Sequence, residues 1–247
     1  MARQRNWWET FFDDLRPAFP RSAPRESLKE ARYICRKLGL KKGMKFLDCP
    51  CGFGRVSLPL AKMGVRVTGV DITRSYLDEF EKKANRAGVK VRLLRQDMRR
   101  ISFRDEFDAA ANLYTSIGYF ESDAQDLLVL KKVFQALRSG GRFMLTTINR
   151  DWIILNFESN GWYEVSGIRV LQSRRFDYSR SVMHDEWRFL KDGAEKVHQT
   201  TIRLFSFHEL RAMLHQVGFV DIEGYGSQDD QPTGRTNRDL YVVARKP

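Results

Sequence analysis

Apolar and polar positions change their spacing several times along the chain, and each change marks an expected element. Short apolar runs with the length of buried strands lie at 45–49, 66–71, 89–96, 107–114 and 142–148. Apolar residues at helical spacing lie at 26–38, 55–63, 75–87 and 123–137. Strands that alternate with helices predict an α/β fold with a parallel sheet covered by helices on both faces. Ligands bind such sheets at the carboxyl ends of the strands.

The pattern after residue 160 predicts strands without helices between them. Three strands are expected at 163–176, 181–190 and 196–205, joined by short polar turns, which is typical of an antiparallel meander. A capping box at Ser206 and Glu209 then starts a helix that Gly218 ends. Strands at 220–225 and 239–245 complete a mostly parallel sheet of seven strands. We therefore expect one domain from 1–160 and 206–247, with an antiparallel insertion at 161–205 over the substrate site.

The first 40 residues form a separate N-terminal helical segment in this interpretation. Trp7, Trp8, Phe11 and Phe12 make an aromatic stripe, and a loop is expected at 16–25 because proline and arginine are frequent there. The stripe has two possible roles. The segment either packs permanently on the body of the protein or acts as a lid over a bound ligand.

Composition and charge narrow the class of protein. Of the 247 residues, 42% are hydrophobic, which is enough for a packed core. The net charge of +12 is dispersed, which favours solvated helix faces, although RNA or an anionic substrate is compatible with it. No apolar run is long enough for a membrane helix, and the N-terminus lacks the apolar core of a secretory signal, so we expect a cytoplasmic protein. Cys35, Cys49 and Cys51 form neither a disulfide framework nor a set of four zinc ligands, and no metal is expected.

The segment that follows the first predicted strand carries the candidate chemistry. Gly52 and Gly54 let the backbone pass close beneath a ligand, and the next helix presents its N-terminus there. Asp71 ends the following strand, where a carboxylate can accept hydrogen bonds from both hydroxyls of a ribose. This geometry serves nicotinamide and S-adenosylmethionine enzymes alike. Ser57 in place of a third glycine, and Asp48 before the loop, favour a ligand with a cationic end, which is S-adenosylmethionine.

With these residues the chain resembles the class I S-adenosylmethionine-dependent methyltransferases over nearly its whole length. Asp48, Gly52 and Gly54 match the first motif of that family, in which an acid precedes three glycines at alternate positions. Pro50 replaces the first glycine. Because proline has no N–H and a fixed φ, the donor can meet backbone amides only from residue 51 onward.

The resemblance implies a Rossmann-like fold, S-adenosylmethionine as cofactor and S-adenosylhomocysteine as product. It places Asp71 on the ribose, Ile72 beside the adenine, and Asp97 at the adenine amino group. The residues expected to bind the donor are Asp48, Pro50, Cys51, Gly52, Arg55, Asp71, Ile72, Tyr76, Asp97, Met98, Asn112 and Leu113.

The segment 112–120 and the inserted meander resemble a subgroup that acts mainly on small molecules. The motif Asn or Asp followed by Pro-Pro-Tyr or Pro-Pro-Phe is missing after the fourth strand, which counts against DNA or a protein glutamine as acceptor. Tyr114, Tyr119 and His184 are the candidate catalytic residues, although the tyrosines could equally be core aromatics.

The predicted function is methyl transfer to a small-molecule acceptor by in-line displacement. Three alternatives stay open: an RNA methyltransferase, a nicotinamide-dependent oxidoreductase, and a non-catalytic S-adenosylmethionine-binding protein. The oligomeric state is open as well.

Overall fold

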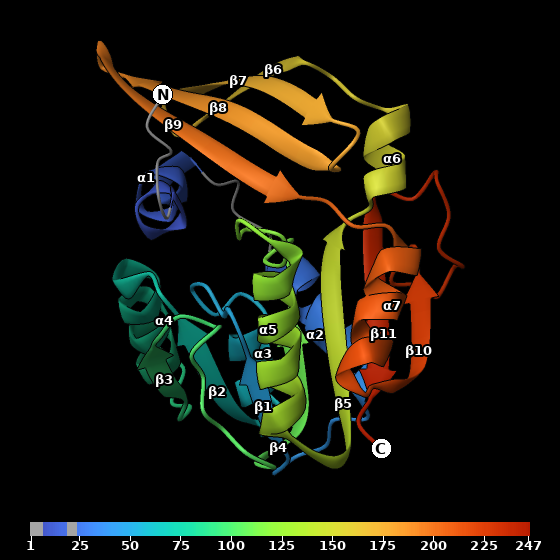
Figure 1. The fold of residues 1–247 in the computed structure, drawn as a ribbon. Helices are drawn as coiled ribbons and strands as arrows, with labels where there is room; N and C mark the ends of the chain where they lie inside the picture. The colour runs from blue at the N-terminus through green and yellow to red at the C-terminus, as the bar shows by residue number, and fades with distance from the viewer. Residues whose placement is uncertain (1–6, 19–23) are drawn as a thin grey trace.

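The computed structural model describes residues 7–18 and 24–247. Seven strands form one sheet in the order β10-β11-β5-β4-β1-β2-β3 (Figure 1). Their bounds are β1 (Lys45–Asp48), β2 (Arg66–Asp71), β3 (Arg92–Arg95), β4 (Phe107–Asn112), β5 (Leu137–Ile148), β10 (Val220–Tyr225) and β11 (Asp239–Arg245). Strand β11 runs antiparallel to β5 and β10, whereas the other pairs are parallel. The predicted mostly parallel sheet of seven strands is confirmed.

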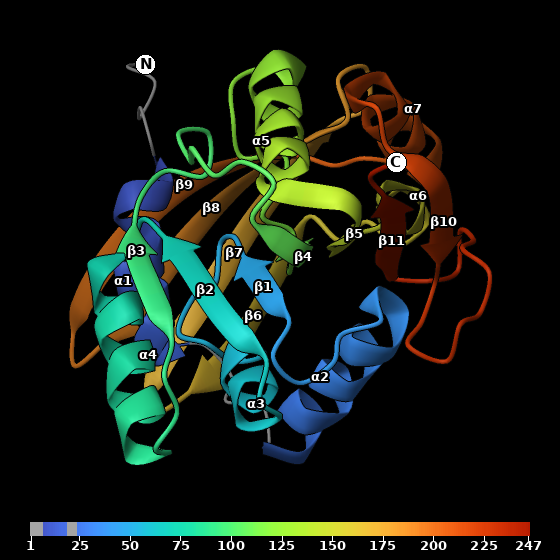
Figure 2. The same cartoon turned by 90° about the horizontal axis from the view of Figure 1, so that it is seen from below.

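Helices cover both faces of this sheet, as Figure 2 shows. One face carries α2 (Pro24–Leu38), α3 (Ser57–Lys62) and α4 (Arg74–Arg86), and the other carries α5 (Asp123–Ala136) and α7 (Phe207–Val217). The central strand β4 serves both cores, because Ala109 and Ala111 face the first set of helices while Ala110 faces the second. Strand order reverses at β1, which has β2 on one side and β4 on the other. Such a reversal is where ligands bind in open α/β sheets.

A second, antiparallel sheet contains four strands, not the three that the sequence pattern predicted. They are β6 (Asn160–Val165), β7 (Ile168–Asp177), β8 (Val182–Lys191) and β9 (Ala194–Arg203). The expected strand at 163–176 is divided because Val165 pairs with Ile168 across a two-residue turn. Ser166 and Gly167 both have positive φ there, as tight hairpin turns require. The assignment of 161–205 as a separate subdomain stays a prediction.

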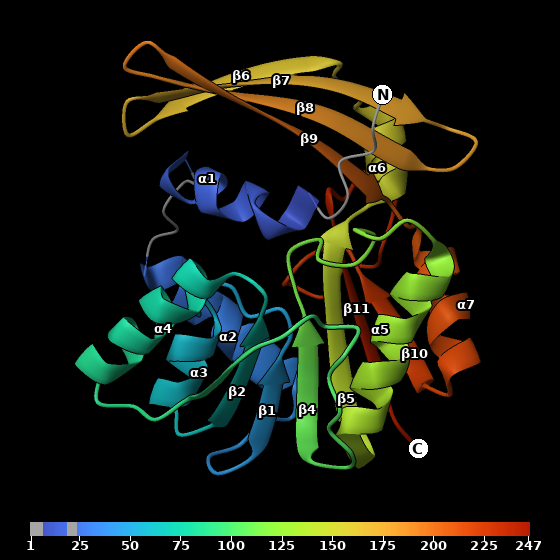
Figure 3. The ribbon, with the colours of Figure 1, turned by 60° about the vertical axis from the view of Figure 1, so that its left-hand side comes forward.

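The second sheet lies above the carboxyl edge of the first, and two helices lie between the sheets (Figures 1 and 3). One is α1 (Phe11–Ala18), which follows the 3-10 turn η1 (Trp7–Glu9), and the other is α6 (Arg150–Leu155), which the sequence pattern did not predict. The ring centroids of Phe11 and Trp187 of β8 are 5.3 Å apart. The loop expected at 16–25 is wrong at both ends, because α1 continues to Ala18 and α2 begins at Pro24; residues 19–23 lie outside the described residues.

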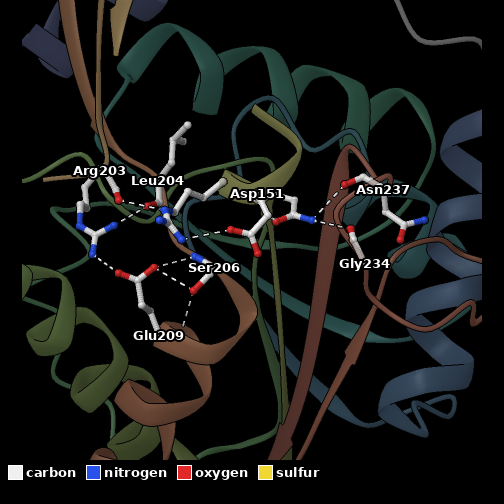
Figure 4. Close-up of polar contacts among 10 residues, drawn as sticks. Asp151, Arg203, Leu204, Ser206, Glu209, Gly234 and Asn237 are labelled. Carbon is white, nitrogen blue, oxygen red and sulfur yellow. Dashed lines mark hydrogen bonds and ion pairs between the residues drawn. The ribbon is translucent and has the colours of Figure 1, made fainter. Parts of the chain in front are cut away.

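The return from the second sheet to the first is held by polar contacts. The capping box at the start of α7 is confirmed, and Figure 4 shows the Glu209 carboxylate meeting both Ser206 and Arg203. The Arg203 amide also donates to the Gly118 carbonyl, at 2.7 Å, in the loop that follows β4. This contact ties β9 directly to the carboxyl edge of the first sheet.

None of the helices in the described ranges is long and apolar enough to cross a membrane.

Candidate functional site

A cavity of about 570 Å³ opens at the carboxyl ends of β1, β2 and β4, beneath the second sheet. This volume falls in the range of small-molecule sites. One end is formed by the loop after β1 and the ends of β2 and β3, through Asp48, Pro50, Cys51, Gly52, Phe53, Arg55, Val56, Val70, Asp71, Ile72, Thr73, Tyr76, Gln96, Asp97 and Met98. The other end is formed by Trp8, Phe12, Leu113, Tyr114, Thr115, Ser116, Tyr119, Phe120, Ile148, Trp187, Ile202, Arg238 and Asp239.

The loop after β1 owes its shape to two glycines. Gly52 and Gly54 have φ of 53° and 76°, and a Cβ on Gly54 would lie 2.3 Å from the Phe80 ring. Three amides of this loop are already engaged: Cys51 donates to the Val70 carbonyl at 2.9 Å, Gly52 donates to Asp71 Oδ2 at 2.8 Å, and Gly54 donates to the Cys51 carbonyl at 3.1 Å. Amides from residue 51 onward were expected to meet the donor. The amides of Cys51 and Gly52 instead hold the loop on β2, and the Gly54 amide closes the turn, so all three already have acceptors.

Asp48 is buried at the entrance of this loop, with 2% of its surface exposed. Its Oδ2 accepts a hydrogen bond from the Ser57 hydroxyl at 2.7 Å, and its Oδ1 has no partner among the described residues. Burial raises the pKa of Asp48 to about 7, although the Ser57 hydrogen bond opposes that shift. Ser57, which the sequence analysis used only as a missing glycine, therefore helps to hold this carboxylate. A buried acceptor without a partner suits a cationic ligand group.

Asp71 lies at the end of β2 and is also buried, at 6% exposure. Its two oxygens accept the amides of Gly52 and Thr73, each at 2.8 Å. Burial raises the pKa of Asp71 and these backbone hydrogen bonds oppose the shift. The Thr73 side chain and the Ile72 amide also stabilise this carboxylate, so Asp71 holds the start of the loop after β2 together with the glycine loop.

The remaining residues expected at the donor end divide into two groups. Asp97 and Met98 border the cavity, and Asp97 is fixed by Arg99, whose Nη2 lies 2.6 Å from Asp97 Oδ2. Burial raises the pKa of Asp97, but the Arg99 hydrogen bonds outweigh it and the net shift is downward. Asn112 does not border the cavity. It is fully buried, and its Nδ2 donates to the Cys49 carbonyl at 2.9 Å, so it supports the loop from behind.

The three candidate catalytic residues have different positions. Tyr114 and Tyr119 line the cavity, whereas His184 does not; it lies on β8 with Nδ1 3.5 Å from the Thr201 hydroxyl. Desolvation of the hydroxyl raises the pKa of both tyrosines, although 43% of the Tyr114 surface is exposed, so neither hydroxyl is prepared to act as a base at neutral pH. His198 is nearly buried and hydrogen-bonds Asp14 at 3.0 Å.

Aromatic residues that the sequence analysis did not assign to the site line its second end. Trp8 and Phe120 meet edge to face at 5.2 Å, and Trp187 reaches the cavity from β8. Trp8 and Phe12 belong to the N-terminal aromatic stripe, which was the available signal for them. Trp187, Arg238 and Asp239 carry no local motif and reach the cavity only through the tertiary fold.

A larger hollow of about 840 Å³ lies on the other side of the loop after β1, between α2, α3 and α4. It shares only Phe53 and Arg55 with the first cavity, and neither Asp48 nor Asp71 borders it. Its cations are Arg16, Arg55, Lys62, Lys82, Lys83 and Arg86, with Glu79 as its acid. We assign the chemistry to the smaller cavity because the buried carboxylates lie there. No group of histidine, cysteine and acidic side chains within residues 7–18 and 24–247 could hold a metal ion.

Comparison with known proteins gives a consistent result. Residues 46–141 match the model of a methyltransferase domain family. YqeM of Bacillus subtilis strain 168, a proposed methyltransferase, is 28% identical over 214 residues, covering 82% of this chain and 84% of YqeM. The CcbJ methyltransferase of Streptomyces caelestis has the same fold over 95% of this chain and 96% of its own, with a TM-score of 0.78 and 18% identity.

A third relative was solved with S-adenosylmethionine bound. CalS10 of Micromonospora echinaspora, an amino pentose methyltransferase, matches over 96% of this chain and 97% of its own, with a TM-score of 0.66 and 20% identity. At these identities the solved structures establish the fold.

The mostly parallel sheet, with a cavity where the strand order reverses at β1, is typical of an α/β enzyme that binds a nucleoside-containing ligand. The match over 46–141 and the shared fold identify an S-adenosylmethionine-dependent methyltransferase. Its methyl donor is S-adenosylmethionine, and the nicotinamide-dependent alternative is set aside.

Proposed function

We propose that this protein transfers the methyl group of S-adenosylmethionine to a nitrogen atom of a small acceptor that binds beneath the second sheet. The observation that carries the proposal is one continuous cavity with two chemically different ends. Buried carboxylates and the glycine loop form the first end, and Trp8, Phe12, Tyr119, Phe120 and Trp187 form the second.

The first end fits the donor residue by residue. Asp71 would accept the ribose hydroxyls, Asp97 would meet the adenine amino group, and Ile72 and Met98 would contact the adenine ring. The partnerless Oδ1 of buried Asp48 would face the cationic amino-acid end of the donor. When bound, S-adenosylmethionine supplies a methyl group on a sulfonium sulfur, which keeps the bonding electrons and leaves as a thioether when the acceptor attacks in line with the C–S bond.

The second end supports an amine as the acceptor group. Methyl transfer to nitrogen moves a positive charge from sulfur to nitrogen, and aromatic faces attract such cations. Four acids, Asp48, Asp71, Asp97 and Asp239, border the cavity against two cations, Arg55 and Arg238. Because this lining is acidic on balance, we propose a neutral or cationic acceptor in place of the anionic one that the net charge suggested. That CalS10 is an amino pentose methyltransferase agrees with a small amine.

The protein's contribution is mainly positional. The loop amides, Asp71 and Asp97 would fix the donor, and the aromatic walls would orient the acceptor and exclude water, which is how proximity lowers such barriers. Tyr114 and Tyr119 would shape the cavity, since burial raises the pKa of both hydroxyls away from that of a useful base.

The test is transfer of tritiated methyl groups into a cell extract, followed by separation according to size and by cation exchange at neutral pH. We expect label in a small product that is retained as a cation. Trp187→Ala should lower the transfer rate by at least about tenfold while S-adenosylhomocysteine affinity stays within about twofold. Val197→Ala, at an exposed position of β9, is the matched control.

Other outcomes would select the alternatives. Label in a macromolecular fraction that ribonuclease removes would favour an RNA acceptor. Donor binding without any labelled product would favour a non-catalytic binding protein.

A further inference from the structure

Three residues from three separate elements meet at one wall of the cavity. Glu30 of α2 is buried at 8% exposure, and its Oε2 lies 3.1 Å from Nη2 of Arg55, which follows the glycine loop. The Arg55 guanidinium lies 3.9 Å from the centre of the Tyr114 ring. The Tyr114 hydroxyl is close enough to the Glu30 carboxylate to oppose the rise that burial causes in the pKa of Glu30. Arg55 and Tyr114 border the cavity, and Glu30 lies behind them.

The backbone at Tyr114 is held in an uncommon conformation. Tyr114 and Thr115 both have φ of 60°, a backbone conformation that residues other than glycine rarely adopt and that lowers stability. The Tyr114 amide donates to Thr146 Oγ1 at 2.9 Å, and the Thr115 amide donates to the Thr146 carbonyl at 3.0 Å. Strand β5 therefore holds the backbone of this turn, while the Arg55 guanidinium, paired with Glu30, packs on its tyrosine ring. Such strain concentrates at functional sites.

We propose that Glu30 is a positioning residue for the amino-acid end of the methyl donor. It fixes the Arg55 guanidinium where it can pair with the donor carboxylate, and it fixes the Tyr114 ring as the wall between donor and acceptor. This inference rests on the proposed function. Helix α2, which lies outside the donor motifs, would then set the affinity for the amino-acid end of the donor.

The charges of the lining support this assignment. The amino-acid end carries one ammonium and one carboxylate group, and Asp48 is the buried acid beside the loop. Arg55 is the cation adjoining that loop, whereas Arg238 immediately precedes β11. A free arginine side chain loses considerable rotamer freedom when it binds a ligand. The Glu30 pair removes that freedom in advance, so the donor meets a guanidinium already in place.

A comparison of two ligands isolates this effect. S-adenosylhomocysteine contains the amino-acid end, whereas 5′-methylthioadenosine has the same adenosine and thioether without it. Calorimetry on Glu30→Gln should show S-adenosylhomocysteine binding weakened by about tenfold and methylthioadenosine binding within about twofold of the wild type. Glu106→Gln is the matched control, because Glu106 Oε1 also lies 3.1 Å from an arginine, Arg92, but at the amino-terminal edge of the sheet.

Double variants show whether Glu30 acts through its partners. Arg55→Ala should produce the same selective loss, and adding Glu30→Gln to it should change the affinity by less than about twofold further. Tyr114→Phe keeps the ring and removes the hydroxyl, so it measures the contact with Glu30 even if Glu30→Gln folds poorly. It should weaken S-adenosylhomocysteine by about threefold, again without affecting methylthioadenosine.

The outcomes separate this inference from the function on which it rests. If the wild type binds neither ligand, the proposed function fails. If the wild type binds both and Glu30→Gln weakens both equally, Glu30 is merely structural and the inference is overturned. Unchanged or tighter S-adenosylhomocysteine binding in Glu30→Gln overturns it as well.

Discussion

Replacing Asp71 with asparagine is the most direct test of the donor site. The substitution keeps the side-chain shape but removes the negative charge and one of two acceptor oxygens. Both oxygens already accept backbone amides at 2.8 Å, from Gly52 and Thr73. In the proposed complex the same two oxygens also accept the two ribose hydroxyls.

The expected loss follows from those two hydrogen bonds. A hydrogen bond to a charged group contributes about 1.5–3 kcal/mol, against about 1 kcal/mol for a neutral pair. One hydroxyl loses its acceptor and the other keeps a neutral one, so the total loss is about 3 kcal/mol. Since each 1.4 kcal/mol corresponds to a factor of about ten, S-adenosylhomocysteine should bind about a hundredfold more weakly.

Isothermal titration calorimetry measures this loss, and thermal unfolding checks that the variant is folded. The matched control is Asp108→Asn, because Asp108 is similarly buried and accepts the Lys45 amide at 2.6 Å, but at the amino end of β4. The control should keep its donor affinity within about twofold. An Asp71→Asn variant that remains folded and binds within about threefold of the wild type would refute the assignment of Asp71 to the ribose.

Three further predictions follow from the same geometry. Burial raises the pKa of Asp48 to about 7, so this acid destabilises the ligand-free protein progressively as the pH rises from about 4 through 7. Asp48→Asn should therefore raise the unfolding temperature at pH 8. It should also bind the donor more weakly and abolish the strengthening of donor binding between about pH 6 and 8. Equal pH dependence of wild type and variant would contradict this. Gly118→Ala should lower the free energy of unfolding, measured in urea, by about 2–4 kcal/mol, because Gly118 has φ of 93° and the new Cβ would lie 2.0 Å from the Arg203 carbonyl oxygen. A loss under about 0.5 kcal/mol would show that the contact between β9 and the loop after β4 is loose. Reversing Lys82 and Arg86 to glutamate should leave methyl transfer to a small acceptor within about twofold, whereas a large loss that depends on salt concentration would favour an RNA acceptor.

Much of the first cavity end could be predicted because its signals are local. Asp48 and Asp71 end strands and Gly52 lies in the loop after β1, and a parallel sheet brings consecutive strand ends to one edge. Asn112 shows the limit of this reasoning. It also ends a strand, but its amide turns to the Cys49 carbonyl and away from the cavity. The position of Asn112 at the end of a strand was predictable, whereas the direction of its side chain depended on the Cys49 carbonyl, which accepts its hydrogen bond.

The second end could not be predicted in the same way. Trp8 and Trp187 are far apart in the chain and reach one cavity only because the second sheet lies over the first with α1 between them. His184 lies on the same strand as Trp187 and misses the cavity, although the insertion as a whole was expected there. The alternation of side chains along a strand is regular, but the face that covers the site is decided by packing.

By itself, the sequence determined the order of helices and strands, the seven-stranded sheet and the acids that flank the glycine loop. Hydrophobic periodicity, glycine and capping residues act over a few neighbouring positions, so they can be recognised without a structure. The tertiary structure decided the aromatic end of the cavity and the contact of Glu30 with Arg55. These features join residues that are distant in sequence, and their positions depend on how the elements pack against one another.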